Sequence, residues 1–203
     1  MGVLLIFLTQ SLCYGAVFSF EIFTENGDYY DNPGVNLYVD VNDGSGKANF
    51  TFYNDSEFDC STARIYFDDG SIFGIDYIMN GPGTEFDRAP EFPGPGDLPN
   101  GEDLVPPFET DREFTIGALS PPPENGVNSI PAGEWVKISF DLTNGGTLDD
   151  VISELYTGQL RVGLHVISFP DGSSESAILI PEPCTLTLFA LGAGLFLRLR
   201  KKH

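Results

Sequence analysis

Apolar and polar residues alternate along much of the chain, so that every second side chain is hydrophobic. Period-two alternation places successive side chains on opposite faces, and it predicts strands with one buried face. Six runs show this pattern: Phe18–Ile22, Val35–Val41, Ala48–Phe52, Ala63–Phe67, Val136–Leu142 and Leu160–Val166. The 23 glycines and 15 prolines supply turns between the runs. We therefore predict a mainly β protein, an antiparallel β-sandwich or jelly-roll-like domain.

Turn residues indicate how neighbouring strands are joined. Asn42-Asp43-Gly44 lies between the second and third runs, and it predicts a β-hairpin. Asp68-Asp69-Gly70 ends the fourth run, and residues 71–78 are expected to return beside that strand.

One short helix is predicted near residue 150. Thr147 precedes Asp150 by three positions, which is the spacing of a capping box. The apolar residues that follow at helical spacing are Leu148, Val151, Ile152 and Leu155. We expect this helix to close one end of the sandwich.

Residues 81–133 differ from the rest of the body. They hold eleven of the 15 prolines, and only Arg112–Leu119 has the composition of a strand. We expect a long ordered loop or a mobile flap rather than a second core. Two interpretations stay open, a loop that carries function or a tolerated insertion.

The net charge of −20 limits the choice of partner. With 30 acidic and ten basic residues there is no basic face for a phosphate backbone, so nucleic acid is excluded. Residues 180–203 hold four basic residues and one acidic residue, which leaves −23 on the rest of the chain. Such a surface repels anionic polymers and attracts divalent cations. The alternative is a solvated acidic face without a partner.

Calcium is the cofactor that the acidic turns favour, if the protein has one. The candidate ligands are Asp40, Asp43, Asp68 and Asp69, with Asn42, Asp171 and Glu175 as further oxygen donors. The first group is not an EF-hand, because its glycine comes one position too early. Asx-Gly pairs are also ordinary turn formers, so the composition fits a protein without a metal equally well.

The sequence offers little material for catalysis. Outside the C-terminal tail it holds one histidine, His165, and between the ends of the chain one cysteine, Cys60. The motifs of serine hydrolases, zinc proteases and phosphate-binding loops are missing from the sequence. The sequence does not exclude a catalytic pair of His165 and Cys60, but we predict no catalytic residues and no enzyme.

Exposed aromatic residues beside loops could instead contact a glycan. The candidates are Tyr29, Tyr30, Tyr53 and Trp135, for which turns and core would also account.

Both ends of the chain have the composition of targeting segments. Val3–Leu12 is apolar and too short to span a bilayer, and small residues follow it. We interpret residues 1–16 as a signal peptide, although no Lys or Arg precedes the apolar run. The alternative is a buried first strand.

The C-terminus combines three features in its last 23 residues. Pro181-Glu182-Pro183 is followed by the uncharged segment 185–197, and a basic cluster ends the chain. Segment 185–197 would make a helix of about 20 Å, short for a hydrocarbon core of about 30 Å. The basic residues are Arg198, Arg200, Lys201 and Lys202, and they should stay on the cytoplasmic side of the membrane. A plain single-span anchor is the alternative.

This arrangement resembles the PEP-CTERM sorting signal, a tail that is also labelled an ice-binding protein C-terminal segment. The resemblance implies recognition of Pro181, Glu182 and Pro183 by an exosortase in the inner membrane of a Gram-negative bacterium that makes exopolysaccharide. Stretches of the body, among them Ala63–Phe67 and Phe169–Ser176, also resemble domains that precede such tails. In this interpretation residues 17–179 are the body and residues 180–203 the sorting signal, with a membrane helix at 185–197.

We therefore expect an exported, non-enzymatic protein of the cell surface or of the exopolysaccharide matrix, which contacts the inner membrane only in transit. The alternative is an extracellular carbohydrate-binding module, with calcium as a candidate cofactor.

Overall fold

The structure is a computed structural model, and it describes residues 15–68, 70–88, 96–119, 130–143 and 145–181. Residues 1–14, Asp69 and residues 182–203 lie outside this part, and with them most of the predicted signal peptide and sorting tail. The predicted cut near Ala16 falls two residues into the first strand, so the mature strand would begin at Val17.

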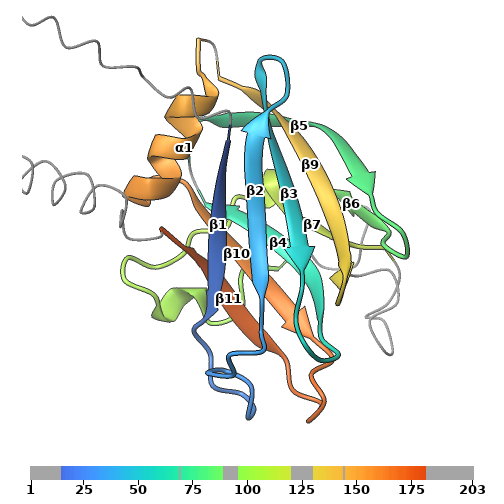
Figure 1. Cartoon of the computed structure of the whole chain (residues 1–203). Helices are drawn as coiled ribbons and strands as arrows, with labels where there is room; N and C mark the ends of the chain where they lie inside the picture. Colours follow the sequence, from blue (N-terminus) through green and yellow to red (C-terminus); the bar gives the residue numbers. More distant parts are fainter. Residues whose placement is uncertain (1–14, 69, 89–95, 120–129, 144, 182–203) are drawn as a thin grey trace, which may run out of the picture.

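In the described part of the chain eleven antiparallel strands form one nearly closed sheet, which confirms the mainly β prediction (Figure 1). The strands are β1 (Gly15–Ile22), β2 (Leu37–Asp43), β3 (Lys47–Asn54), β4 (Ser61–Asp68), β5 (Ile72–Asn80), β6 (Phe86–Arg88), β7 (Ile116–Ala118), β8 (Ile130–Pro131), β9 (Glu134–Leu142), β10 (Arg161–Ile167) and β11 (Glu175–Ile180). Their order is β5-β9-β3-β2-β1-β11-β10-β4-β7-β6, and β8 pairs with β4. Strands β2, β3 and β9 lie in front of β4, β7 and β10 in Figure 1.

The core lies between these two layers and is rich in aromatic rings. The alternating apolar residues of the predicted runs point inward, and most of them are less than 10% exposed. Phe67 of β4 lies at the centre, with ring centroids 4.9 Å from Phe140 and 5.6 Å from Phe50. Since Phe50 and Phe140 come from β3 and β9, these contacts join the back layer to the front layer.

One predicted hairpin is confirmed and the other is wrong. Strands β2 and β3 pair in register across the Gly44 turn, with Val41 opposite Phe50. Strand β5 forms where a strand was expected, but it pairs with β9 and not with β4. A strand has only two edges, and β4 gives one to β10 and the other to β7 and β8. The chain after Asp68 therefore has to cross to the other layer.

The predicted helix is confirmed as α1 (Leu148–Thr157). The side chain of Thr147 accepts from the Asp150 backbone N–H, and the Asp150 carboxylate accepts from the Thr147 N–H, which completes the capping box. Gly158 ends the helix at a φ of 72°, a left-handed value that glycine adopts without strain. Val151 and Leu155 are buried in the core beside β1, β2 and β3, so α1 closes one end of the sheet.

The Pro-rich region adds short regular elements to the fold. Its described parts contain the short strands β6, β7 and β8 and two 3-10 helices, η1 (Gly101–Asp103) and η2 (Arg112–Phe114). Leu98 and Phe108 pack on Tyr66 at the outer face of the back layer, where they form a second, small apolar cluster. The apolar residues of the region therefore pack on the sheet and not in a separate core. Tyr66 is an apolar residue on an outward position of β4, and the region covers it.

Candidate functional site

Three aromatic residues stand in one line across the outer face of the front layer. Tyr38 of β2 lies opposite Tyr53 of β3, and Tyr53 lies opposite Trp135 of β9. All three are half-buried, and each has a fully packed core residue beside it in its strand: Leu37, Phe52 and Val136. We call Tyr38, Tyr53 and Trp135 the aromatic row. The row places two phenol rings and one indole on adjacent strands.

The two tyrosines of the row are held in place by each other and by an acid. Their rings stack with centroids 4.9 Å apart and planes 15° apart. The Tyr38 hydroxyl donates to Asp55 Oδ2 at 2.8 Å. Burial, together with this bond, raises the pKa of Tyr38 to about 12, so the phenol stays neutral in ordinary buffers. The stack and this hydrogen bond therefore hold the two rings in position, and the Tyr38 hydroxyl already has a partner in Asp55.

Polar residues occupy the rest of the same face, in rows parallel to the aromatic row. The next row in register consists of Asp40, Thr51 and Lys137. The row beyond it consists of Asn42, Asn49 and Ser139. Thr51, Asn49 and Ser139 are less than 10% exposed, while Asp40, Asn42 and Lys137 are half-buried. Hydroxyl, amide, carboxylate and ammonium groups thus lie beside the rings.

The structure brings together two of the four predicted glycan contacts. Tyr53 and Trp135 belong to the aromatic row. Tyr29 instead packs on Phe58 and Phe169, with ring centroids at 4.7 and 5.5 Å. Tyr30 is 42% exposed and lies in the connection between β1 and β2. The sequence interpretation missed Tyr38, although its place between Leu37 and Val39 in an alternating strand puts it on the outer face.

The candidate calcium ligands Asp40 and Asp43 lie in β2 and Asp68 lies at the end of β4, and several already accept hydrogen bonds. Asp40 Oδ2 accepts from Asn42 at 3.3 Å, and Asp43 Oδ1 accepts from the Gly46 N–H at 3.2 Å. Asp68 is paired with an arginine, as described below, and Asp69 lies outside the described residues. No group of three or more His, Cys, Asp and Glu side chains in the described part of the chain is arranged to hold a metal ion. Calcium binding stays a prediction.

Asp171 and Glu175, the other suggested acids, meet the segment after β1. Asp171 Oδ2 accepts from the Asp28 N–H at 2.9 Å. Glu175 is fully buried, and its Oε2 accepts from the Thr24 hydroxyl at 2.6 Å and from the Asn26 N–H at 3.1 Å. These bonds tie the connection between β1 and β2 to the one between β10 and β11.

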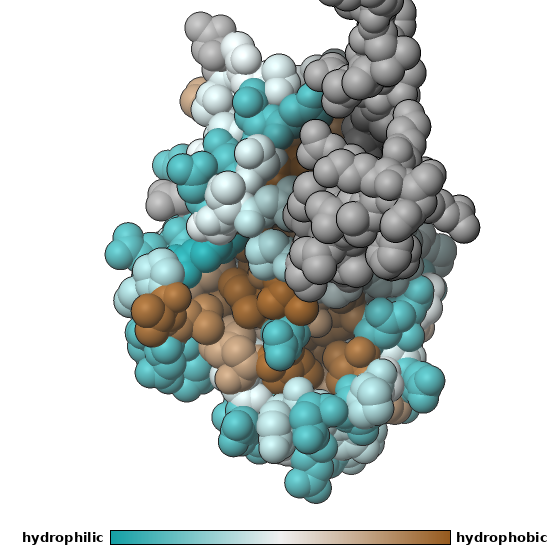
Figure 2. All heavy atoms as spheres, turned by 60° about the vertical axis from the view of Figure 1, so that its left-hand side comes forward, coloured by the Kyte–Doolittle hydropathy of each residue, from teal (hydrophilic) through white to brown (hydrophobic). Residues whose placement is uncertain are grey.

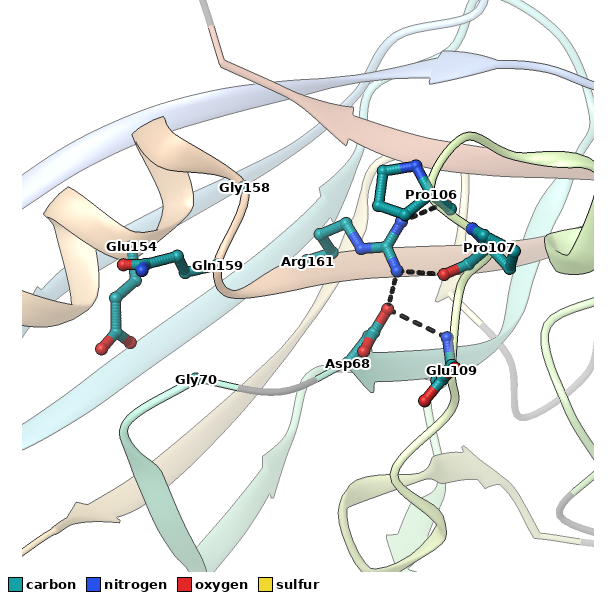
Figure 3. A pocket seen from close by; sticks show the side chains of 9 residues that line it. All are labelled: Asp68, Gly70, Pro106, Pro107, Glu109, Glu154, Gly158, Gln159 and Arg161. Carbon is teal, nitrogen blue, oxygen red and sulfur yellow. Dashed lines mark hydrogen bonds and ion pairs between the residues drawn. The ribbon is translucent and has the colours of Figure 1, made fainter.

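A shallow pocket of about 590 Å³ lies between the end of α1 and the loop at residues 106–109. Figure 3 shows Arg161 directed at Asp68 and Pro107, with Glu154 and Gln159 on the opposite side. Arg161 donates to the carbonyl oxygens of Pro106 and Pro107 and to Asp68 Oδ2. Because its guanidinium is occupied by these acceptors, the pocket is better explained as a structural joint than as an anion site.

His165 and Cys60 do not form a catalytic pair. Cys60 is 2% exposed in the core, and its Sγ lies 3.9 Å from Asn54 Oδ1. Burial raises the pKa of the Cys60 thiol, which disfavours the nucleophilic thiolate. His165 lies on the outward side of β10, opposite Arg64 of β4. Burial, and secondarily the charge of Arg64, lowers the pKa of His165 to about 4.

We expect His165 to make the protein less stable in acid. An unfolded histidine takes up a proton near pH 6.5, whereas the folded protein takes it up only near pH 4. The contribution is therefore complete above pH 6.5 and is lost as the pH falls to 4, by on the order of 3 kcal/mol. Urea unfolding at pH 7 and pH 4.5 should show a smaller difference for His165→Gln than for the natural protein. An equal difference would show that another group is responsible.

A second feature of the surface is an apolar area on the side of β1 and β11. Figure 2 shows hydrophobic side chains gathered in the middle of this face, bordered by hydrophilic ones. Half-buried or exposed apolar residues on or beside β1 and β11 include Val17, Phe23, Ile178 and Ile180. The area lies where β11 ends and the chain continues into the C-terminal tail.

Comparison with family models, with curated proteins and with solved structures finds no match to this chain. Within the described residues no helix is long and apolar enough to span a membrane, and segment 185–197 lies outside them. The resemblance of the tail to a sorting signal therefore stays a prediction.

Proposed function

We propose that this chain is an exported, non-enzymatic protein of the cell envelope or exopolysaccharide matrix of a Gram-negative bacterium. In this proposal an exosortase recognises Pro181, Glu182 and Pro183 while segment 185–197 enters the inner membrane. The terminal basic cluster holds the end of the chain on the cytoplasmic side. The body is a jelly-roll-like sandwich that needs no resident cofactor.

The observation that carries the proposal is the position at which β11 ends. All eleven strands found in the described residues precede residue 181, and β11 ends at Ile180, directly before the Pro-Glu-Pro motif. Pro181 is exposed, so the chain leaves the body at its surface. A peptidase could remove the tail without breaking a strand pair of the described sheet. The apolar area beside Ile180 adds support, because exposed apolar side chains on one side of a very acidic body favour contact with a membrane.

The proposal is tested by replacing the central acid of the motif. Glu182→Ala should leave the tail attached in cells that export the protein, because the recognition motif is lost. Intact-mass measurement would show one species that ends at His203, whereas the natural protein is shorter by most of residues 182–203. The matched control is Glu102→Ala, which removes an exposed carboxylate from η1 and should be processed normally. A natural protein that keeps its basic end, with or without the peptidase gene, would contradict the proposal.

The second candidate function is carbohydrate binding, and the aromatic row favours it. Three aromatic side chains in register on an outward sheet face are not required by the core. Tyrosine and tryptophan offer an apolar ring surface together with a polar group, which suits a ligand that is itself part apolar and part hydroxyl. Carbohydrate binding by the aromatic row would not need calcium, since the row holds no cluster of carboxylates.

A further inference from the structure

We propose that the outer face of β2, β3 and β9 binds an uncharged glycan chain that lies across the strands, without calcium. The inference deepens the second candidate function and rests on it. It assigns the surface, the direction of the ligand and the chemical class of the ligand.

The aromatic row indicates the direction in which the glycan chain would lie on the sheet. Neighbouring strands lie about 4.8 Å apart, so three residues in register span about 10 Å perpendicular to the strands. Tyr38, Tyr53 and Trp135 therefore form a line that suits a short stretch of oligosaccharide rather than a single sugar. In the described part of the chain, the Tyr38–Tyr53 stack is the only ring contact of either tyrosine. Both rings are half-buried, and the proposal places the C–H face of a sugar against their exposed part.

The polar rows supply hydrogen bonds beside the rings. Asp40, Thr51 and Lys137 lie two residues along their strands from the aromatic row, a step of roughly 7 Å. A pyranose that stacks on a ring directs its hydroxyl groups sideways, where a carboxylate accepts and an ammonium donates. Lys137 and Asp40 are half-buried, so both stand in part above the face. A ligand with many hydroxyl groups can use both of these side chains.

The charges of the face favour an uncharged chain. Asp40 and Lys137 carry opposite charges within one row, and Asp55 is already bonded to Tyr38. The whole chain carries −20, so a polyanion would be repelled before it reached the rings. A polycation would be attracted over the entire acidic surface, with no preference for this face. A neutral polysaccharide meets neither difficulty.

The chain has a built-in reporter for this binding. Trp135 is the only tryptophan of the sequence and belongs to the row. Protein exported by cells is titrated with hydroxyethylcellulose, galactomannan or dextran as neutral probes, and with alginate as the anionic probe. We expect at least one neutral probe to change the Trp135 emission, equally in EDTA and in calcium. A change caused only by alginate in calcium would overturn the inference but would leave a calcium-dependent module as the function.

Substitutions then locate the surface. Affinity electrophoresis in the neutral probe should show a loss of about tenfold or more for Tyr53→Ala, the size expected when an aromatic anchor is removed. The matched control is Tyr30→Ala, which removes an exposed tyrosine elsewhere. If Tyr30→Ala abolished binding and Tyr53→Ala did not, the function would stand and the site would be wrong. No retardation of the natural protein by any neutral probe would overturn both.

Discussion

Replacing Phe67 with alanine should lower the free energy of unfolding by about 3–5 kcal/mol, the range for removing a buried phenylalanine. Phe67 is 0% exposed, and its ring contacts Phe50, Phe52 and Phe140. The rings at positions 50, 52 and 140 belong to the front layer, so the cavity would open between the two layers. Because these rings are held by their strands, the space cannot close fully, and the lost contacts are not replaced. Urea unfolding followed by the Trp135 emission would measure the loss.

The chain offers a matched control for this prediction. Phe73 of β5 is 68% exposed, and Phe73→Ala should change stability by no more than about 0.5 kcal/mol. Similar losses from the two substitutions would mean that the cluster around Phe67 does not join the layers. A loss below about 1 kcal/mol at Phe67 would contradict the packing described for the core.

Alternation was enough to predict β1, β2, β3, β4, β9 and β10, because burial of one face is a local property of the sequence, but it did not predict β6, β8 or β11. Val39 and Phe50 show this, since each lies between polar or half-buried neighbours and is fully buried. The pairing partner of each strand, in contrast, could not be predicted from local patterns alone. The turn at residues 68–70 has the residues of a hairpin, yet β5 joins β9, which comes more than 50 residues later in the chain. That choice depends on which edges of β4 are already occupied, and no local pattern contains this information.

The Pro-rich region shows the same limit. Leu98 and Phe108 are isolated apolar residues in a stretch without periodicity, so nothing local marks them as buried. Leu98 and Phe108 are buried because they pack on the outer face of β4 and β10, where Tyr66 and Gly163 lie. A side-chain carbon at Gly163 would come within 2.6 Å of Leu98. The glycine therefore allows the region to dock closely.

The candidate site was half predictable from the sequence. Tyr53 and Trp135 could be selected as aromatic residues near turns, but nothing in the sequence places them opposite each other. Tyr38 could be assigned to the same face from alternation alone, whereas the line of three needs the register of β2, β3 and β9. Tyr29 shows the opposite error, because a tyrosine in a turn can serve as core when two phenylalanines surround it.

The ion pair between Arg161 and Asp68 is the second contact with a large expected effect. Asp68 has a side chain only 3% exposed, and its Oδ2 accepts from Arg161 and from the Glu109 N–H at 3.0 Å. The Arg161 guanidinium also lies 5.2 Å from the centre of the Phe108 ring. This group of contacts joins the loop at residues 106–109 to β4 and β10. Removing one partner leaves the other buried and unpaired, which costs about 3–5 kcal/mol.

We therefore expect Asp68→Ala to lower the free energy of unfolding by about 3–5 kcal/mol. The control is the pair Arg112–Asp97, in which both side chains are 64% exposed. Asp97→Ala should cost no more than about 1 kcal/mol, because water and salt screen an exposed pair. The two variants remove the same kind of group from the same region, so they separate burial from charge. Equal effects in urea unfolding would mean that the buried pair does not hold the loop to the sheet.

Replacing both partners distinguishes the worth of the pair from the cost of an unpaired charge. The double variant Asp68→Ala/Arg161→Met removes both charges and keeps most of the apolar contact with Phe108. Because no charge is then left buried, it should recover part of the stability that Asp68→Ala loses. Limited proteolysis should follow the same order, with cleavage near residues 96–110 fastest for Asp68→Ala. A double variant as unstable as the sum of both single variants would show that the carboxylate acts through the Glu109 N–H and not through Arg161.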